Sequence, residues 1–250
     1  MTERLEIETA KASDHVFTIT NALKNILIEN GVSSDKISVL PNAVDPTKFN
    51  LNPKDKKLES ELGFEGKVVI GYIGSFVEYE GLDLLLEACS ILKEKHGDIF
   101  RLLLVGDGDT MQLLRRTARF LQLEDQVVFT GRIPHDDVQR YYSLIDIAPL
   151  PRKGLRVCEL VSPLKPFEAM GAGKVLITSS VQALAEIVQD GVTGMVFEKD
   201  NSEDLAAKLE TAILDEELRK NIGENANKWV IENPVSYTHL RAHETSLHRV

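Results

Sequence analysis

The sequence predicts an α/β fold in which a parallel sheet is covered by helices on both faces. Apolar runs of strand length alternate with segments of helical periodicity along nearly the whole chain. Strands that are buried on both faces read as continuous apolar runs, and their alternation with helices is typical of parallel sheets. The composition is consistent with a substantial core, because 43% of the 250 residues are hydrophobic and 27% are charged.

The first part of the chain is expected to contain strands at residues 14–19 and 36–40, with a helix at 21–29 between them. A polar stretch punctuated by prolines follows. Because proline and clustered polar residues interrupt regular structure, we expect a linker at 46–66. The residues before it, 1–45, are too few for a complete domain of their own.

Six further strands are expected after the linker, each a run of apolar residues: 67–73, 100–105, 126–130, 145–150, 174–178 and 195–197. The segments between and after them carry apolar residues three and four positions apart, which indicates helices. Most of these helices are expected at 82–92, 110–121, 136–143, 183–188, 205–213 and 218–229. The series predicts one domain over residues 67–232.

Ligands of parallel α/β folds bind beyond the carboxyl ends of the strands, where the strand order reverses. The loops that follow strands, and are therefore the expected binding region, lie at 74–81, 106–109, 131–135 and 151–168. Gly74, Gly106 and Gly108 allow a backbone to approach a ligand closely, although tight turns explain them equally well. Arg132 and Ile133 precede a proline, and this stiffened segment can present backbone groups to a flat base.

The loop at 151–168 is the most informative. Four basic side chains gather there in a chain of net charge −10: Arg152, Lys153, Arg156 and Lys165. Ser162 is expected to cap a helix that starts at Pro163 and Leu164 and ends at the glycines of 171–173. A helix start beside cations favours phosphate, and Glu168, about one turn further in, can bind two ribose hydroxyls. The alternative is a solvated basic loop with a surface glutamate.

The charge and the cysteines exclude several classes of function. A net charge of −10 argues against nucleic acid as a partner, since backbone binding needs clustered Lys and Arg. Cys89 and Cys158 provide neither a disulfide framework nor zinc-ligand spacing, which fits a reducing cytoplasm. The polar start is not a signal peptide, and no apolar run approaches the ~18 residues that span a bilayer. We therefore expect a cytoplasmic protein.

The last residues break the pattern of the domain. Residues 235–250 contain three of the six histidines, His239, His243 and His248, and no helical stripe continues into them. His239 and His243 are four positions apart, as in a metal-binding helix. We favour a non-native tail instead, because the string resembles translated adapter sequence.

Five segments, in this order, resemble the donor half of the GT4 family (group 1) of retaining glycosyltransferases: YIGSFVEYEGLDLLLEA, LLLVGDGD, VVFTGRIPHDDVQRYYSLIDIAPLP, SPLKPFEAMGAGKVLIT and ALAEIVQDGVTGMVF. Members have two facing Rossmann-like domains, the GT-B arrangement. The resemblance covers about residues 10–231. It implies that 67–232 is the donor-binding domain and that 1–45 is a short remnant of the N-terminal acceptor domain, so the chain is expected to be truncated at its front.

The resemblance also implies roles for individual residues. Gly74 and Ser75 would lie near the donor diphosphate, and Lys165 would touch phosphate. The nucleotide would be bordered by Gly106 and Gly108. The base would lie between Arg132 and Ile133, and the ribose would bind Glu168. The donor would be a UDP or GDP sugar, the acceptor a glycan or lipid-linked glycan, and the transfer of a hexosyl group would retain configuration without a metal or other cofactor.

Two departures from the family pattern concern charge. Many members have Arg and Lys in the first loop where this chain has Ser75 and Glu80, and a glutamate where it has Leu160. We expect Arg152, Lys153 and Lys165 to supply the missing positive charge near the phosphates. The candidate catalytic residues are therefore Lys165, Glu168 and Arg152, and the other binding candidates in this loop are Lys153, Ser162, Pro163 and Leu164.

Other classes of function remain as alternatives. A sugar-nucleotide epimerase has a similar build, but it needs an acid–base pair that the sequence does not offer. A non-catalytic nucleotide-sugar-binding module fits a chain with half of its cleft missing, and we expect donor binding with little transfer. A dinucleotide dehydrogenase is disfavoured because neither Gly74 nor Gly106 begins a complete G-x-G-x-x-G. The resemblance leaves room for peripheral contact with the inner face of the membrane through the absent domain.

Overall fold

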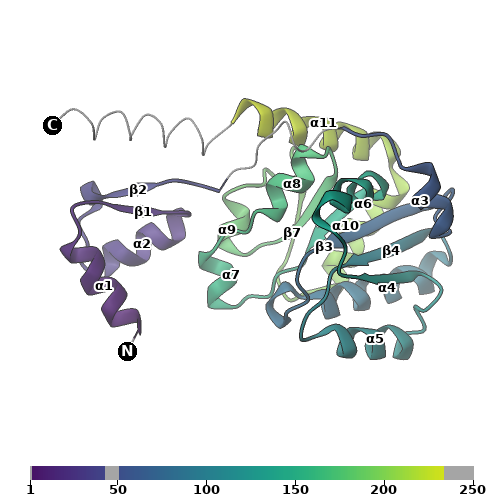
Figure 1. The fold of residues 1–250 in the computed structure, drawn as a ribbon, viewed down its shortest axis with the longest axis horizontal. Coiled ribbons are helices and arrows are strands. Elements are labelled where there is room, and N and C mark those ends of the chain that lie inside the picture. Colours follow the sequence, from purple (N-terminus) through teal and green to yellow (C-terminus); the bar gives the residue numbers. More distant parts are fainter. Residues whose placement is uncertain (1, 43–50, 234–250) are drawn as a thin grey trace.

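The computed structural model describes residues 2–42 and 51–233. Its N-terminal part is a small unit made of α1 (Thr2–Ala12), β1 (Val16–Thr18), α2 (Asn21–Glu29), the 3-10 turn η1 (Ser34–Lys36) and β2 (Ile37–Val39) (Figure 1). The two strands pair in parallel, as expected when a helix connects them. Thr20 starts α2 by accepting a hydrogen bond from the amide of Leu23.

The rest of the described chain is built on a parallel sheet of six strands. They are β3 (Val68–Ile73), β4 (Phe100–Val105), β5 (Val127–Gly131), β6 (Ile147–Leu150), β7 (Val175–Ser179) and β8 (Met195–Phe197). Their order across the sheet is β5-β4-β3-β6-β7-β8. The chain therefore builds outward from β3 in one direction and then restarts beside it with β6. The carboxyl ends of β3 and β6 form the point where the strand order reverses.

Helices cover both faces of this sheet (Figure 1). On one face α4 (Leu82–His96) lies between α5 (Met111–Phe120) and α10 (Ser202–Leu214). On the other, α8 (Lys165–Gly171) packs against α11 (Glu216–Glu232), and α6 (Val138–Leu144) packs against α3 (Lys56–Glu61). The two faces are filled because right-handed crossovers in opposite directions place their helices on opposite sides.

The α/β fold with a central parallel sheet is confirmed. Each of the eight expected strands is present, and its observed ends differ from the expected ends by at most two residues. Three short or polar helices were not expected: α1, α3 and α7 (Arg156–Leu160). α3 lies inside the expected linker, where Asp55 caps it and Leu58 joins the core. Residues 43–50 and the proposed tail at 235–250 lie outside the described residues. Within the described residues, no helix combines the length and apolar character needed to cross a membrane.

Candidate functional site

Two adjoining cavities open at the carboxyl ends of the central strands. The larger has a volume of about 550 Å³ and the smaller about 320 Å³. Ile73, Gly74, Ser75 and Val138 line both, so the loop after β3 forms part of their common wall. Because this loop leaves the sheet where the strand order reverses, the cavities lie where ligands of such folds bind.

The predicted glycines bring the loops after β3 and β4 into direct contact. A Cβ atom on Gly106, whose φ is +134°, would lie 1.9 Å from the carbonyl oxygen of Gly74. A Cβ atom on Gly108 would lie 2.3 Å from the carbonyl oxygen of Phe76. Gly74 and Gly106 line the cavities, whereas Gly108 lines neither and serves this close packing. The glycines are thus required by backbone approach between loops, in addition to any approach to a ligand.

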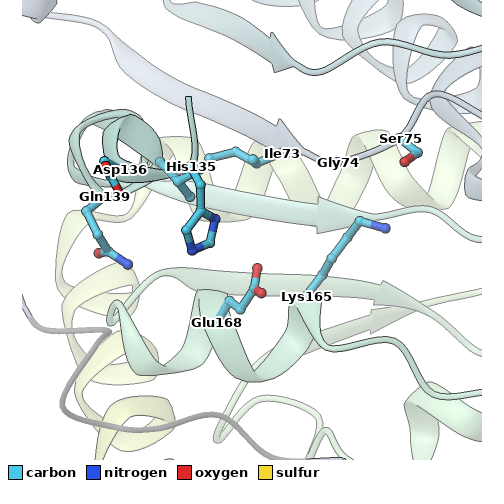
Figure 2. A pocket seen from close by; sticks show the side chains of 9 residues that line it. Ile73, Gly74, Ser75, His135, Asp136, Gln139, Lys165 and Glu168 are labelled. Carbon is cyan, nitrogen blue, oxygen red and sulfur yellow. The ribbon is translucent and has the colours of Figure 1, made fainter. Parts of the chain in front are cut away.

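Lys165 reaches from the start of α8 to the wall of the large cavity. Figure 2 shows its side chain extended toward the loop of Gly74 and Ser75. Its stem lies against Gly74, because a Cβ atom there would be 2.3 Å from Lys165 Cε. The ammonium group lies 3.1 Å from a carboxylate oxygen of Glu80 and 5.3 Å from the ring centre of Tyr72. Lys165 therefore presents a positioned cation to the large cavity.

Glu168 lies three residues further along α8 and lines the same cavity. Its Oε2 atom accepts a hydrogen bond of 3.0 Å from the hydroxyl group of Tyr142. Burial raises the pKa of Tyr142 well above its usual value, and the neighbouring Glu168 carboxylate adds to the rise. The tyrosine therefore stays a neutral donor that fixes the orientation of Glu168. Sequence reasoning missed this contact, because nothing distinguishes Tyr142 from the other apolar positions on its helix.

The far wall of the large cavity comes from the segment after β5. His135, Asp136 and Gln139 lie there, on η3 (His135–Asp137) and the first turn of α6, facing Lys165 and Glu168 across the opening (Figure 2). His135 ends the loop at 131–135, which the sequence predicts to be part of the binding region. An imidazole and an amide in this wall add hydrogen-bonding groups to the charged pair on α8.

The structure does not bring Arg152 and Lys153 to either cavity. Arg152 is buried, with 4% of its side chain exposed, and its guanidinium group donates to the carbonyl oxygen of Val161 at 2.7 Å. Lys153 pairs with Asp83 at 2.7 Å in a separate small pocket between α4 and α5. Of the three cations expected to replace the missing first-loop charge, Lys165 is the one that lines the large cavity.

Arg132 and Ile133 line the smaller cavity, together with Gly106. The Arg132 side chain is 84% exposed and its guanidinium group lies 3.7 Å from Asp107. Ile133, by contrast, is partly buried and packs against the hydrophobic core. This arrangement suits the predicted contact with a flat base through backbone groups.

The predicted start of α8 is wrong by two residues. The helix begins at Lys165 with Leu164 as its N-cap residue, because the amides of Phe167 and Glu168 donate to the carbonyl oxygen of Leu164. Ser162 makes no capping hydrogen bond; it is buried, and its hydroxyl group donates to the carbonyl oxygen of Pro163. Ser162, Pro163 and Leu164 line neither of the two cavities.

Three consecutive carbonyl groups before α8 are each held by a side chain from elsewhere in the chain. Thr20 donates to Leu160 at 2.6 Å and Asn42 donates to Ser162 at 2.6 Å. Between them, Val161 accepts from Arg152 as described above. The N-terminal unit is also held by Glu186, whose carboxylate accepts from the backbone amides of Asn21 and Ala22, the first residues of α2. The loop that precedes Lys165 is thus fixed from both sides.

A family model described as Glycosyl transferases group 1 matches residues 53–229. Among the relatives, an uncharacterized glycosyltransferase of Methanocaldococcus jannaschii, MJ1069, is 25% identical over 224 residues, which cover 89% of this chain and 55% of MJ1069. The capsular polysaccharide biosynthesis glycosyltransferase CapM of Staphylococcus aureus is 28% identical over 229 residues, which cover 88% of this chain and 57% of CapM. The chain thus spans about half the length of the curated relatives it matches.

Two solved structures show the same architecture. HepE of Anabaena in complex with UDP-glucose superposes with a TM-score of 0.85 at 21% identity, covering 99% of this chain and 67% of HepE. The C-terminal domain of LpcC from Francisella tularensis superposes with a TM-score of 0.67 at 21% identity, covering 78% of this chain and all of that domain. These likenesses confirm the expected Rossmann-like fold of the GT-B type.

Proposed function

The chain belongs to the glycosyl transferases group 1 family, and we propose that its large cavity binds the nucleoside diphosphate of a sugar donor for transfer to an acceptor glycan. One observation carries the proposal: Lys165 and Glu168 stand one turn apart on α8 and line the same cavity. A cation suits a diphosphate, and a carboxylate suits the adjacent hydroxyl groups of ribose. The cavity lies at the edge of the sheet where ligands of this fold bind.

The proposed roles follow the two cavities. Lys165, beside the loop of Gly74 and Ser75, neutralises the charge that grows on the leaving diphosphate as the sugar departs. Glu168 holds the ribose in the large cavity, and the base occupies the smaller cavity beside Ile133. Arg152 acts behind the cavity, by holding the carbonyl group of Val161, and does not touch the donor.

We propose UDP as the nucleotide, because HepE, which has the same fold, is described in complexes with UDP and UDP-glucose. GDP is the alternative that a titration distinguishes. For the acceptor we propose a polysaccharide or lipid-linked glycan, since CapM and the amylovoran biosynthesis glycosyltransferase AmsK of Erwinia amylovora are named for polysaccharide synthesis. The resemblance to the GT4 family supports transfer with retention and without a metal, which NMR of the product anomer and assays with a chelator test.

The experiment is a calorimetric titration of the purified chain with UDP, GDP, ADP and uridine. We expect UDP to bind, and Lys165→Ala to weaken UDP binding about tenfold while uridine binding is unchanged, since the lost hydrogen bond is charge-assisted. Lys95→Ala is the matched control, because Lys95 also pairs with a glutamate, Glu210, but lies far along α4. Equal losses for UDP and uridine would contradict the assignment of Lys165 to the diphosphate.

A further inference from the structure

Glu80 is buried behind Lys165 and faces two cations at once. It is 3% exposed, at the end of the turn η2 (Glu78–Glu80). Its Oε1 atom lies 3.1 Å from Lys165 Nζ and 3.6 Å from Arg152 Nε. The pKa of the neighbouring Tyr72 is raised, mainly by burial and secondly by the Glu80 carboxylate. A carboxylate therefore lies directly behind the cation of a site whose proposed ligand is an anion.

The two cations differ in their freedom to meet a ligand. Arg152 is buried, held by Val161, with its guanidinium group 5.4 Å from the ring centre of Tyr79. Lys165 is 20% exposed and lines the cavity. Lys165 is thus the cation that an anion in the cavity can reach. The carboxylate of Glu80 is in direct contact with that cation.

A carboxylate in contact with the ammonium group weakens the attraction of Lys165 for a second anion. The carboxylate also repels that anion directly, because charges near a protein surface interact at an effective dielectric constant well below that of water. The ammonium group has three donors, so it can bind Glu80 and a phosphate oxygen together. The carboxylate does not block Lys165; it lowers the net positive charge that the phosphate meets.

We propose that Glu80 moderates the affinity of the cavity for a diphosphate group by partly neutralising Lys165. The inference rests on the proposed function, since it takes a nucleoside diphosphate as the ligand. The product nucleoside diphosphate has a terminal phosphate with one more ionisable oxygen than the sugar donor has. Without Glu80, the full charge of Lys165 would hold this product more tightly than the donor, so Glu80 favours its release.

The test is a titration of Glu80→Gln with UDP and uridine, beside the wild type. The variant keeps the shape and an acceptor oxygen but loses the charge, so we expect UDP to bind about tenfold more tightly and uridine to bind as before. Glu210→Gln is the matched control, because it removes the same charge from the Lys95 ion pair elsewhere. The double variant Glu80→Gln/Lys165→Gln should lose the gain, since the effect acts through Lys165.

Unchanged or weaker UDP binding by Glu80→Gln, with uridine binding intact, overturns the inference. If Glu80→Gln does not fold, Glu80→Asp keeps the buried charge but shortens the side chain, which moves the carboxylate away from Lys165. A smaller gain in UDP affinity is then expected, and no gain overturns the inference. If the wild type binds neither UDP nor GDP, the proposed function fails. Titration with inorganic pyrophosphate then tests Glu80 separately.

Discussion

Tyr142 donates a hydrogen bond from its buried hydroxyl group to Oε2 of Glu168, over 3.0 Å. The contact joins α6 to α8. It sets the direction in which Glu168 presents its carboxylate to the large cavity. A residue that lines neither of the two cavities thereby sets the geometry of one that is proposed to bind ribose.

Tyr142→Phe should weaken the binding of UDP by a factor of about two to ten, the usual value of one hydrogen bond. Inorganic pyrophosphate should bind as it does to the wild type, because the diphosphate is assigned to Lys165. Calorimetry with both ligands measures the difference. Tyr141→Phe is the control, since Tyr141 is the adjacent tyrosine and packs on the core only in part. Equal weakening of both ligands would mean that Tyr142 supports the fold and not the ribose site.

Arg152 and Lys153 are adjacent in sequence, and their substitutions should have different effects. Lys153→Ala should leave UDP affinity within about twofold of the wild type and change stability by less than about 1 kcal/mol, as for other partly exposed pairs. Arg152→Met should reduce the free energy of unfolding by about 3 kcal/mol, because it leaves Glu80 short of a partner and the Val161 carbonyl group unbound. Urea unfolding and UDP titration measure the two effects. A large loss of UDP affinity in Lys153→Ala would restore the interpretation drawn from the sequence.

Gly106→Ala should destabilise the protein much more than Gly63→Ala. Both glycines have positive φ, +134° and +68°, so both substitutions strain the backbone, by about 1–3 kcal/mol each. Only at Gly106 would the new methyl group also meet a carbonyl oxygen, that of Gly74, whereas no atom lies within 4 Å of the position at Gly63. The difference in thermal midpoint between the two variants measures mainly the cost of separating the two loops. Similar midpoints would show that the loops can separate without cost.

Stability should depend on pH through Lys174, which lies at the opposite end of the sheet from the site. Burial lowers the pKa of Lys174 to about 8, with Asp146 opposing the change and Lys54 adding to it. In the unfolded chain, Lys174 keeps its proton up to its ordinary pKa of about 10.4. Between pH values of about 8 and 10.4 the unfolded chain therefore binds one proton more than the folded chain. The free energy of unfolding rises with pH over this range.

Lys174→Met should therefore be more stable than the wild type at pH 7.5, by about 2 kcal/mol, and this advantage should shrink by pH 9.5. Comparing the two proteins cancels the titrations that they share. Urea unfolding at both pH values provides the measurement. An advantage that stays constant with pH would show that Lys174 titrates normally in the folded protein.

The sheet could be predicted because its strands are buried on both faces and read as continuous apolar runs. The helices that were missed lack this kind of signal. α7 has five residues with Cys158 as its one buried member, and α3 has six residues, of which Leu58 is the apolar anchor in a polar surrounding. These helices depend on contacts with other parts of the folded chain, and no periodic spacing of apolar residues marks them in the sequence.

The site shows the same division. Lys165 and Glu168 could be predicted, since a helix at the end of a strand sends residues three apart to one side. The different fates of Arg152 and Lys153 could not, because they depend on the path of a loop that is fixed by the hydrogen bond from the amide of Lys153 to Tyr79. Glu80 stood out as a departure in charge, but only the fold shows that it faces two cations.

The fixed carbonyl groups of Leu160, Val161 and Ser162 limit how this loop can be engineered. Grafting residues 151–168 onto a homologous scaffold would carry Arg152 along but leave behind Thr20 and Asn42, and the peptide planes they hold would be able to flip. A successful chimera must transplant all three donors as a unit. The residues exchanged between family members therefore have to be chosen by the hydrogen bonds that they make, and not as one contiguous segment.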